Sequence, residues 1–351
     1  MSSLTFLSDV IELSDDLEAF NDYAIAQGWS DGLPLIPPTE ARVERMLRGY
    51  ERTSASVIAH LPVEESPCSI EKIAINAVMA GCKPDYMPLL IATVQAVADP
   101  AFNLTGIQAT TNPVAPMIIV NGPIRHRLNI NSSYGCFGPG WQANATIGRA
   151  LRLLLINVGG AIPGVQDMSV MGQPGKYTMC VGENEEASPW EPLHVERGLQ
   201  PTQSAVTVVG VSGCFNILGT RRAAAMVREI ARALGHVGSN DYRFAGQPLC
   251  ALNPTHAESL ANSGYDKARL KQALFELAKR PVREFSSPRF FEPRSRELGD
   301  DLPDDRLIAL TEHPEDVFIM VAGGSGAGVH NLCLPSFGNT RAVTVAVPVL
   351  S

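Results

Sequence analysis

The chain has 351 residues, of which 45% are hydrophobic and 18% are charged, so it has the composition of a globular protein with a large core. Its formal net charge is -8 and it has no run of basic residues, which argues against nucleic acid as a partner. No apolar stretch reaches the roughly 18 residues of a membrane span, and the N-terminus lacks the basic and apolar regions of a signal peptide. We therefore expect a cytoplasmic protein, built as one large α/β unit or as two domains.

The cysteines support a reducing compartment. They are scattered and odd in number, and they form no CxxC or CxxH pair. This pattern predicts free thiols and argues against a structural zinc site. The seven are Cys68, Cys82, Cys136, Cys180, Cys214, Cys250 and Cys333.

The first 110 residues are predicted to be a helical region that packs on the rest of the chain. Apolar residues recur at helical spacing, and the segments are separated by glycine- and proline-rich stretches such as GWSDGLPLIPPT. Helices are expected over residues 15–27, 39–48, 70–81 and 85–98.

Residues 111–351 are predicted to form an α/β core, which may be continuous with the helical region. Strands are expected over 115–123, 204–213, 317–330 and 340–349, and helices over 144–158, 220–234 and 255–280. Residues 161–203 have the composition of a loop, and residues 281–305 that of a linker or exposed loop. The sheets are expected to be parallel or mixed.

Three predicted strands run directly into glycine-rich turns: MIIVNGP, VTVVGVSG and VFIMVAGGSG. A glycine turn between a strand and a helix can present unpaired backbone N–H groups to a carboxylate or phosphate. The alternative is that the glycines serve only to make tight connections. The tripeptide Gly-Cys-Phe occurs at 135–137 and 213–215, each time between a strand and a helix, which suggests an internal duplication of the segments near 117–159 and 206–238.

No nucleotide-cofactor motif accompanies these turns. GGSGAGVH lacks the GK[ST] of a phosphate-binding loop, and it is not a GxGxxG sequence followed by an acidic residue about 20 positions later. The sequence therefore leaves the cofactor unidentified. A divalent metal stays open, because His and Glu are plentiful but no ligand spacing is diagnostic.

The densest group of titratable residues lies in GQPGKYTMCVGENEEASPWEPLHVERG, residues 172–198. Its prolines and glycines restrict the shape of the loop, and a shaped loop rich in ionisable groups suits general acid–base chemistry. We identify Glu183, Glu185, Glu186 and His194 as candidate catalytic residues. The alternative is a solvated acidic loop, or one locked to the body of the protein by Glu–Arg pairs.

Further candidates lie near the glycine turns. His330 follows the third turn and is a candidate acid or base, with turn capping as the alternative. Cys136 and Cys214 each precede a predicted helix on a glycine turn, where a thiolate would be favoured, although buried cysteines are usually inert. Candidate ligand-binding residues are Asn144, Arg149, Lys176, Gly323, Gly324 and Gly326.

Several long segments resemble a family of bacterial proteins of about the same length, and the resemblance covers most of the chain. The segments include GWSDGLPLIPPTEARVERML, NATIGRALRLLLINVGG and QPGKYTMCVGENEEASPWEPLHVERG. Members of this family accompany, or are fused to, small proteins with a UGSC or CGSC motif that look like selenocysteine or cysteine redox proteins. The resemblance implies a two-component enzyme whose partner supplies the thiol or selenol. This chain has no such motif, since Ser212-Gly213-Cys214 is not CGSC.

Two main hypotheses follow. The first is an enzyme of lyase, reductase or hydrolase type that acts on a small carboxylate or carbonyl compound, as a homo-oligomer or with a second subunit. The second is a non-catalytic structural subunit of such a complex. A binding protein for an anionic metabolite is a third reading.

Overall fold

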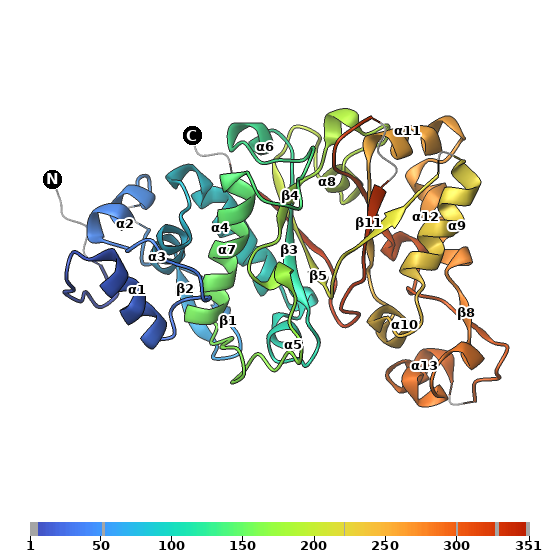
Figure 1. Cartoon of the computed structure of the whole chain (residues 1–351), viewed down its shortest axis with the longest axis horizontal. Helices are drawn as coiled ribbons and strands as arrows, with labels where there is room; N and C mark the ends of the chain where they lie inside the picture. The colour runs from blue at the N-terminus through green and yellow to red at the C-terminus, as the bar shows by residue number, and fades with distance from the viewer. Residues whose placement is uncertain (1–5, 51–52, 221, 300, 327–329, 349–351) are drawn as a thin grey trace.

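Two four-stranded sheets lie face to face, and helices cover the outer side of each, so that the molecule has four layers (Figure 1). The computed structural model describes residues 6–50, 53–220, 222–299, 301–326 and 330–348. The first sheet has the order β12-β5-β3-β4, formed by Val343–Ala346, Ala205–Val211, Ala115–Asn121 and Cys180–Gly182. The second has the order β10-β7-β11-β6, formed by Phe318–Val321, Leu249–Leu252, His330–Leu334 and Phe215–Leu218. Both sheets mix parallel and antiparallel pairs, which confirms the predicted α/β class.

Alternating side chains hold the layers together. In β3, Met117 and Ile119 point into the apolar cluster between the sheets, whereas Ile118 packs into the cluster beneath the helices. In β10, Phe318 and Met320 face the space between the sheets, and the residues that alternate with them face the other helical layer. Because successive strand residues point to opposite faces, a strand buried on both sides reads as a continuous apolar run. This is why the sequence predicts both strands from their apolar runs.

The helical layer on the first sheet comes from both parts of the chain. It consists of α3 (Ile70–Ala80), α4 (Met87–Ala98) and α7 (Gln142–Asn157), close to three predicted helices. The remaining elements of this half are α1 (Leu17–Ala26), α2 (Glu40–Met46), the hairpin β1 (Val57–Leu61) and β2 (Ser66–Ser69), α5 (Leu104–Gln108) and α6 (Ile124–Arg127). No single described helix is long and apolar enough to cross a membrane.

The second helical layer differs from the prediction in two places. The helix expected over 255–280 is broken into α11 (Pro254–Asn262) and α12 (Lys267–Leu277), because Gly264 has a positive φ and Asp266 caps α12 with its side chain. The expected linker 281–305 instead buries Phe285 and Phe291 in the core. The layer also contains α9 (Ala223–Leu234), and the remaining elements are α8 (Leu193–Glu196), α10 (Asn240–Phe244), α13 (Ser295–Leu298) and the pair β8 (Arg280–Pro281) and β9 (Leu307–Ile308).

The two sheets repeat one pattern of strands. Taken in the order β12, β5, β3, β4 and β6, β11, β7, β10, the second strand of each sheet is antiparallel to both neighbours and the last two are parallel. β6 follows β5 in the chain but pairs in the second sheet, and β12 follows β11 but pairs in the first. The second sheet is therefore formed by one continuous stretch of the chain, residues 215–334, whereas the first sheet is completed by β12, which follows that stretch.

The structure does not confirm the duplication suggested by the two Gly-Cys-Phe sequences. The strands at the start of the two segments, β3 and β5, are antiparallel neighbours in the same sheet. The helices at their ends lie in different layers, with α7 on the first sheet and α9 on the second. The pattern repeated between the sheets instead matches β3 with β7 and places Asn121 and Asn253 at equivalent strand ends.

A buried carboxyl group makes stability depend on pH. Asp241 in α10 is fully buried and accepts hydrogen bonds from Ser239 Oγ at 2.8 Å and from the backbone N–H and Oγ of Ser336. Burial raises the pKa of Asp241 from its ordinary value of 3.8 to about 6, against the lowering effect of these hydrogen bonds. Because the folded protein binds this proton more tightly than the unfolded chain, the resulting stabilisation is complete below pH 3.8 and is lost as the pH rises through about 6.

We expect Asp241→Asn to remove this pH dependence. Between pH 5 and pH 8 the wild-type protein should lose about 1 kcal/mol of unfolding free energy through this group, and the variant should not. Urea unfolding of both proteins at the two pH values measures the effect, and all other titrating groups cancel in the comparison. Parallel changes in the two proteins would contradict the assignment.

Candidate functional site

The candidate site lies where β3 and β4 end, at the edge of the first sheet that also carries α6 and α8 (Figure 1). The two strands are parallel, so the residues that follow them emerge side by side. Asn121 ends β3, and Glu183 comes directly after β4. The predicted catalytic segment is thus placed at a strand edge of the kind where α/β proteins bind ligands, and it is not a solvated loop.

Glu183 is fully buried at the centre of the site. Its Oε2 accepts hydrogen bonds from Asn121 Nδ2 at 2.6 Å and from the backbone N–H of Leu193 at 2.7 Å. Its Oε1 has no hydrogen bond among the described residues, and the Nζ of Lys267 is 4.0 Å away. Burial raises the pKa of Glu183, although Lys267 and the two donors act in the opposite direction. The environment therefore favours a protonated carboxyl group more than solvent would.

Arg125 connects the neighbouring carboxylates. Its guanidinium group is almost completely buried, with Nη2 2.9 Å from Glu185 Oε2 and 2.8 Å from Glu186 Oε1. It also donates to the backbone carbonyls of Gly122 at 3.2 Å and Glu183 at 2.7 Å. Glu185 accepts two further hydrogen bonds, from Asn121 Nδ2 and the N–H of Gly122. Glu185 is therefore a fixed carboxylate rather than a group free to change its partners.

Glu186 and His126 form the exposed rim of the site. The side chain of Glu186 is 57% exposed and that of His126 is 67% exposed, and His126 Nε2 lies 2.8 Å from Glu186 Oε1. The hydrogen bond from Arg125 is the main reason that the pKa of Glu186 falls to about 2. Glu186 is therefore ionised at any physiological pH, and it is suited to hold a charge in place rather than to transfer a proton.

His194 lies in the first turn of α8 and is completely buried. Its Nδ1 is 4.0 Å from Glu185 Oε1, and neither ring nitrogen makes a hydrogen bond of ordinary geometry among the described residues. Burial lowers the pKa of His194, while Glu185 and the nearby carbonyls of Pro201 and Gln200 raise it in part. The imidazole is thus neutral at pH 7 and available to accept a proton.

The second half of the protein contributes the lysines of the site. Lys267 and Lys271, both in α12, bind Glu196 at the end of α8, with a distance of 3.1 Å from Lys267 Nζ to Glu196 Oε2. The indole N–H of Trp190 donates to the backbone carbonyl of Tyr265 at 3.0 Å. These contacts fix the 183–196 segment against both halves of the molecule.

The third glycine turn meets the loop of residues 131–136 beside this segment. The N–H of Gly323 donates to the carbonyl of Ser132 at 2.8 Å, and Asn184 Nδ2 donates to the carbonyl of Gly323 at 3.3 Å. The ring of Tyr134 lies against Gly324, where there is no space for a side chain. The predicted cradle for an anion is not supported here, because the N–H groups of Gly323 and Gly326 already donate to other groups of the protein. Residues 327–329 of this turn lie outside the described residues.

Comparison with protein-family models, curated proteins and solved structures finds no match to this chain.

The second glycine turn is remote from the site. β5 is antiparallel to β3, so the turn after Val211 lies at the opposite edge of the sheet from Glu183. Cys214 in this turn is exposed and leads into β6, whereas the helix α9 begins only at Ala223. The helix N-terminus expected to activate this cysteine is therefore absent from the described turn.

Cys136 is also a poor nucleophile in this structure. It is buried, and burial raises the pKa of its thiol to about 11, although the N–H groups of Gly323, Cys136 and Phe137 act in the opposite direction. The thiol is thus protonated at neutral pH. In the part of the chain that the structure describes, no three His, Cys, Asp or Glu side chains are placed to hold a metal ion.

Four other candidates have structural partners elsewhere. Arg149 binds Asp31 through two hydrogen bonds of 2.8 Å, and Asn144 binds the backbone of the 131–136 loop. Lys176 binds Asp167 near the start of β3, at the opposite end of the strands from Glu183.

His330 is exposed at the start of β11, and its Nδ1 is 3.0 Å from Asn216 Nδ2. All four are polar residues whose type suits either a ligand or a structural contact.

Three important residues of the site were not predicted from the sequence. Asn121 could have been suspected, because it ends an apolar strand and precedes Gly-Pro. Arg125 offered charge for a carboxylate but was expected at the surface by default, yet it is 2% exposed. Lys267 had no local signal, because its role depends on a contact between the two halves of the molecule.

Proposed function

We propose that this protein is an enzyme that transfers protons to and from a small carboxylate or carbonyl compound at the carboxyl ends of β3 and β4. The observation that supports this most directly is a group of buried polar atoms without hydrogen bonds among the described residues. They are Asn121 Oδ1 and Glu183 Oε1, and the buried ring nitrogens of His194 join them, because the nearby backbone carbonyls of Pro201 and Gln200 lie outside ordinary hydrogen-bond geometry. Buried polar groups are normally paired, so unpaired ones gathered at one place point to a role in binding or catalysis.

The pKa shifts suit acid–base chemistry. Burial raises the pKa of Glu183 and lowers that of His194, so this strand end favours the protonated form of a carboxyl group and the neutral form of an imidazole, the forms that a general acid and a general base need. Arg125 holds Glu185 and Glu186 in position. In the proposed reaction His194 removes a proton from the substrate and Glu183 protonates the developing oxyanion. The reverse transfers restore both residues.

The test is turnover of pooled small carboxylates and carbonyl compounds in D2O, followed by proton NMR with and without dithiothreitol. Loss of a substrate signal, or its exchange for deuterium, reports catalysis. We expect His194→Gln and Glu183→Gln to lower the rate by about 100-fold or more. Glu191→Gln, an exposed change in the same loop, should keep the wild-type rate. Full activity in both site variants, or no turnover of any compound, would contradict the proposal.

A non-catalytic subunit is the second candidate. Large apolar side chains are exposed on the N-terminal segment and α1, beside a hollow of about 760 Å³. They are Leu7, Val10, Ile11, Leu13 and Leu17. Such a surface favours a further copy of the chain or the thiol- or selenol-bearing partner that the family resemblance implies. The free state of all seven cysteines supports a cytoplasmic location.

A further inference from the structure

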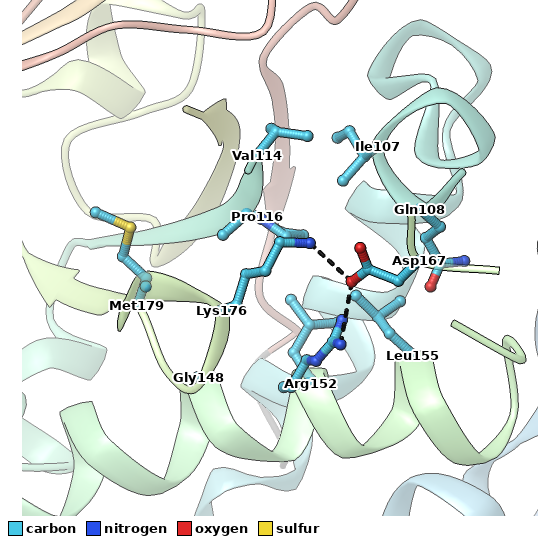
Figure 2. A pocket seen from close by; sticks show the side chains of 13 residues that line it. Ile107, Gln108, Val114, Pro116, Gly148, Arg152, Leu155, Asp167, Lys176 and Met179 are labelled. Atoms are coloured by element: carbon cyan, nitrogen blue, oxygen red, sulfur yellow. Dashed lines mark hydrogen bonds and ion pairs between the residues drawn. The ribbon is translucent and has the colours of Figure 1, made fainter. Parts of the chain in front are cut away.

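A small cavity lies at the edge of the first sheet opposite the candidate site. It is lined by the start of β3, by α5 and α7, and by the 161–179 segment (Figure 2). Its volume is about 20 Å³, which is room for one or two water molecules. Much of the wall is apolar and is formed by Ile107, Val114, Leu151, Leu155 and Met179.

Two cations share one carboxylate in this cavity. Figure 2 shows Lys176 and Arg152 approaching Asp167 from two sides, with Lys176 Nζ 2.7 Å and Arg152 Nη2 3.2 Å from the same oxygen, Oδ2. The three side chains are only 14%, 13% and 4% exposed, respectively. Asp31 is the other carboxylate whose charge raises the pKa of Arg152, and it is already bound by Arg149. With all three groups ionised, the cavity carries an excess of one positive charge in a poorly hydrated place, and burial accordingly lowers the pKa of both Lys176 and Arg152.

Gln108 supplies the second, independent observation. It lines the cavity and is 2% exposed, and neither its Nε2 nor its Oε1 has a hydrogen-bond partner among the described residues. Leaving a buried amide unpaired costs about 1–3 kcal/mol, so an occupant that pairs with it is favoured. An anion would accept from Nε2 and would also offset the excess charge of Arg152 and Lys176.

We propose that this cavity is a binding site for a small anion of halide or formate size, held by Arg152, Lys176 and Gln108. The volume selects this class, because room for one or two water molecules suits a halide or formate ion and excludes larger carboxylates. Since residues 161–179 cover the cavity and Asp167 already anchors them there, the anion would tighten the attachment of this segment to α7. The site is independent of the proposed catalytic function.

Bromide is the probe for this proposal. Crystals of the full chain grown in bromide and measured at its absorption edge should show an anomalous peak within hydrogen-bonding reach of Arg152, Lys176 and Gln108. In solution, bromide should raise the Tm by about 2 °C or more relative to gluconate at equal ionic strength, because gluconate is too large to enter. Formate should act like bromide.

The matched variants are Lys176→Met and Lys279→Met. Both remove a lysine that is paired with one carboxylate, but only Lys176 lines the cavity. The bromide shift should disappear in Lys176→Met and persist in Lys279→Met. A cavity that holds only water in bromide-grown crystals, or an equal Tm shift in both variants, overturns the proposal. If Lys176→Met does not fold, the anomalous peak of the wild-type crystals decides.

Discussion

Replacing Arg125 by methionine is expected to lower the free energy of unfolding by about 3–5 kcal/mol. Methionine keeps the apolar stem of the side chain but removes the guanidinium group. The Glu185 carboxylate then loses its cation, and the carbonyls of Gly122 and Glu183 lose a donor. Because the guanidinium is almost completely buried, water cannot easily replace these contacts. The size of the effect follows from leaving a buried carboxylate uncompensated.

The control is Arg127→Met in the same short helix. Arg127 is exposed, so its replacement should change the unfolding free energy by no more than about 0.5 kcal/mol. Urea unfolding at pH 7 compares the two variants with the wild type. Equal losses in Arg125→Met and Arg127→Met would show that Arg125 is not the centre of the network.

The pH dependence gives Arg125→Met a second readout. The pKa of Glu186 is about 2 in the folded protein, mainly because of the hydrogen bond from Arg125. A depressed pKa gives stability that is present above the ordinary value of 4.5 and is lost as the pH falls toward about 2. In Arg125→Met this loss on acidification should become smaller. An NMR titration should place the pKa of Glu186 closer to its ordinary value.

The elements that were predicted correctly are those with a strong local signal. α7 has apolar residues at helical spacing along its whole length, and β3 and β5 are continuous apolar runs buried on both faces. β4 could not be recognised, because it has only three residues in a segment rich in Pro, Gly and Glu. β11 begins with His330 and Asn331, which have little strand preference, and it exists because β6 and β7 pair with it.

The arrangement of the strands depends on contacts that no local pattern records. The Gly-Cys-Phe sequence at 213–215 resembles a strand-to-helix turn, yet Phe215 starts β6 and pairs with Cys333 of β11. The two sheets share one order of parallel and antiparallel strand pairs, and only the pairing of their strands shows it. Ile118 and Cys250 occupy equivalent positions, but the segments around them share little sequence.

Only the loop residues of the candidate site could be predicted from the sequence, and their partners could not. The density of ionisable residues in a loop shaped by Pro and Gly identified Glu183 and His194, which share a buried site. Their partners are distant in sequence. Asn121 ends β3 and binds Glu183, and Lys267 lies in α12, in the other half of the chain. Sequence also cannot tell a polar side chain that binds a ligand from one that binds its own backbone. Asn144 is the clearest example of the second kind.

We expect Asn144→Leu to lower the free energy of unfolding by about 3 kcal/mol. Asn144 is buried in α7, and its Oδ1 accepts the N–H of Asn131 at 2.8 Å. Its Nδ2 donates to the carbonyls of Asn131 at 3.0 Å and Cys180 at 3.1 Å. Leucine is close in size but serves none of these groups, so the 131–136 loop would lose its attachment to α7 and β4. Gln142→Leu, an exposed change in the same helix, should alter stability by no more than about 0.5 kcal/mol.

The reactivity of Cys136 distinguishes the two roles of Asn144. The thiol lies in the loop that Asn144 holds and is 4% exposed, whereas Cys214 is exposed. In the native wild-type protein, iodoacetamide should therefore modify Cys214 and spare Cys136. In Asn144→Leu, peptide mass spectrometry should find Cys136 modified as well, because the loop opens without global unfolding. If the variant were as stable as the wild type and kept Cys136 protected, Asn144 would not be a structural anchor, and ligand binding would again be the better explanation for a buried asparagine at this position.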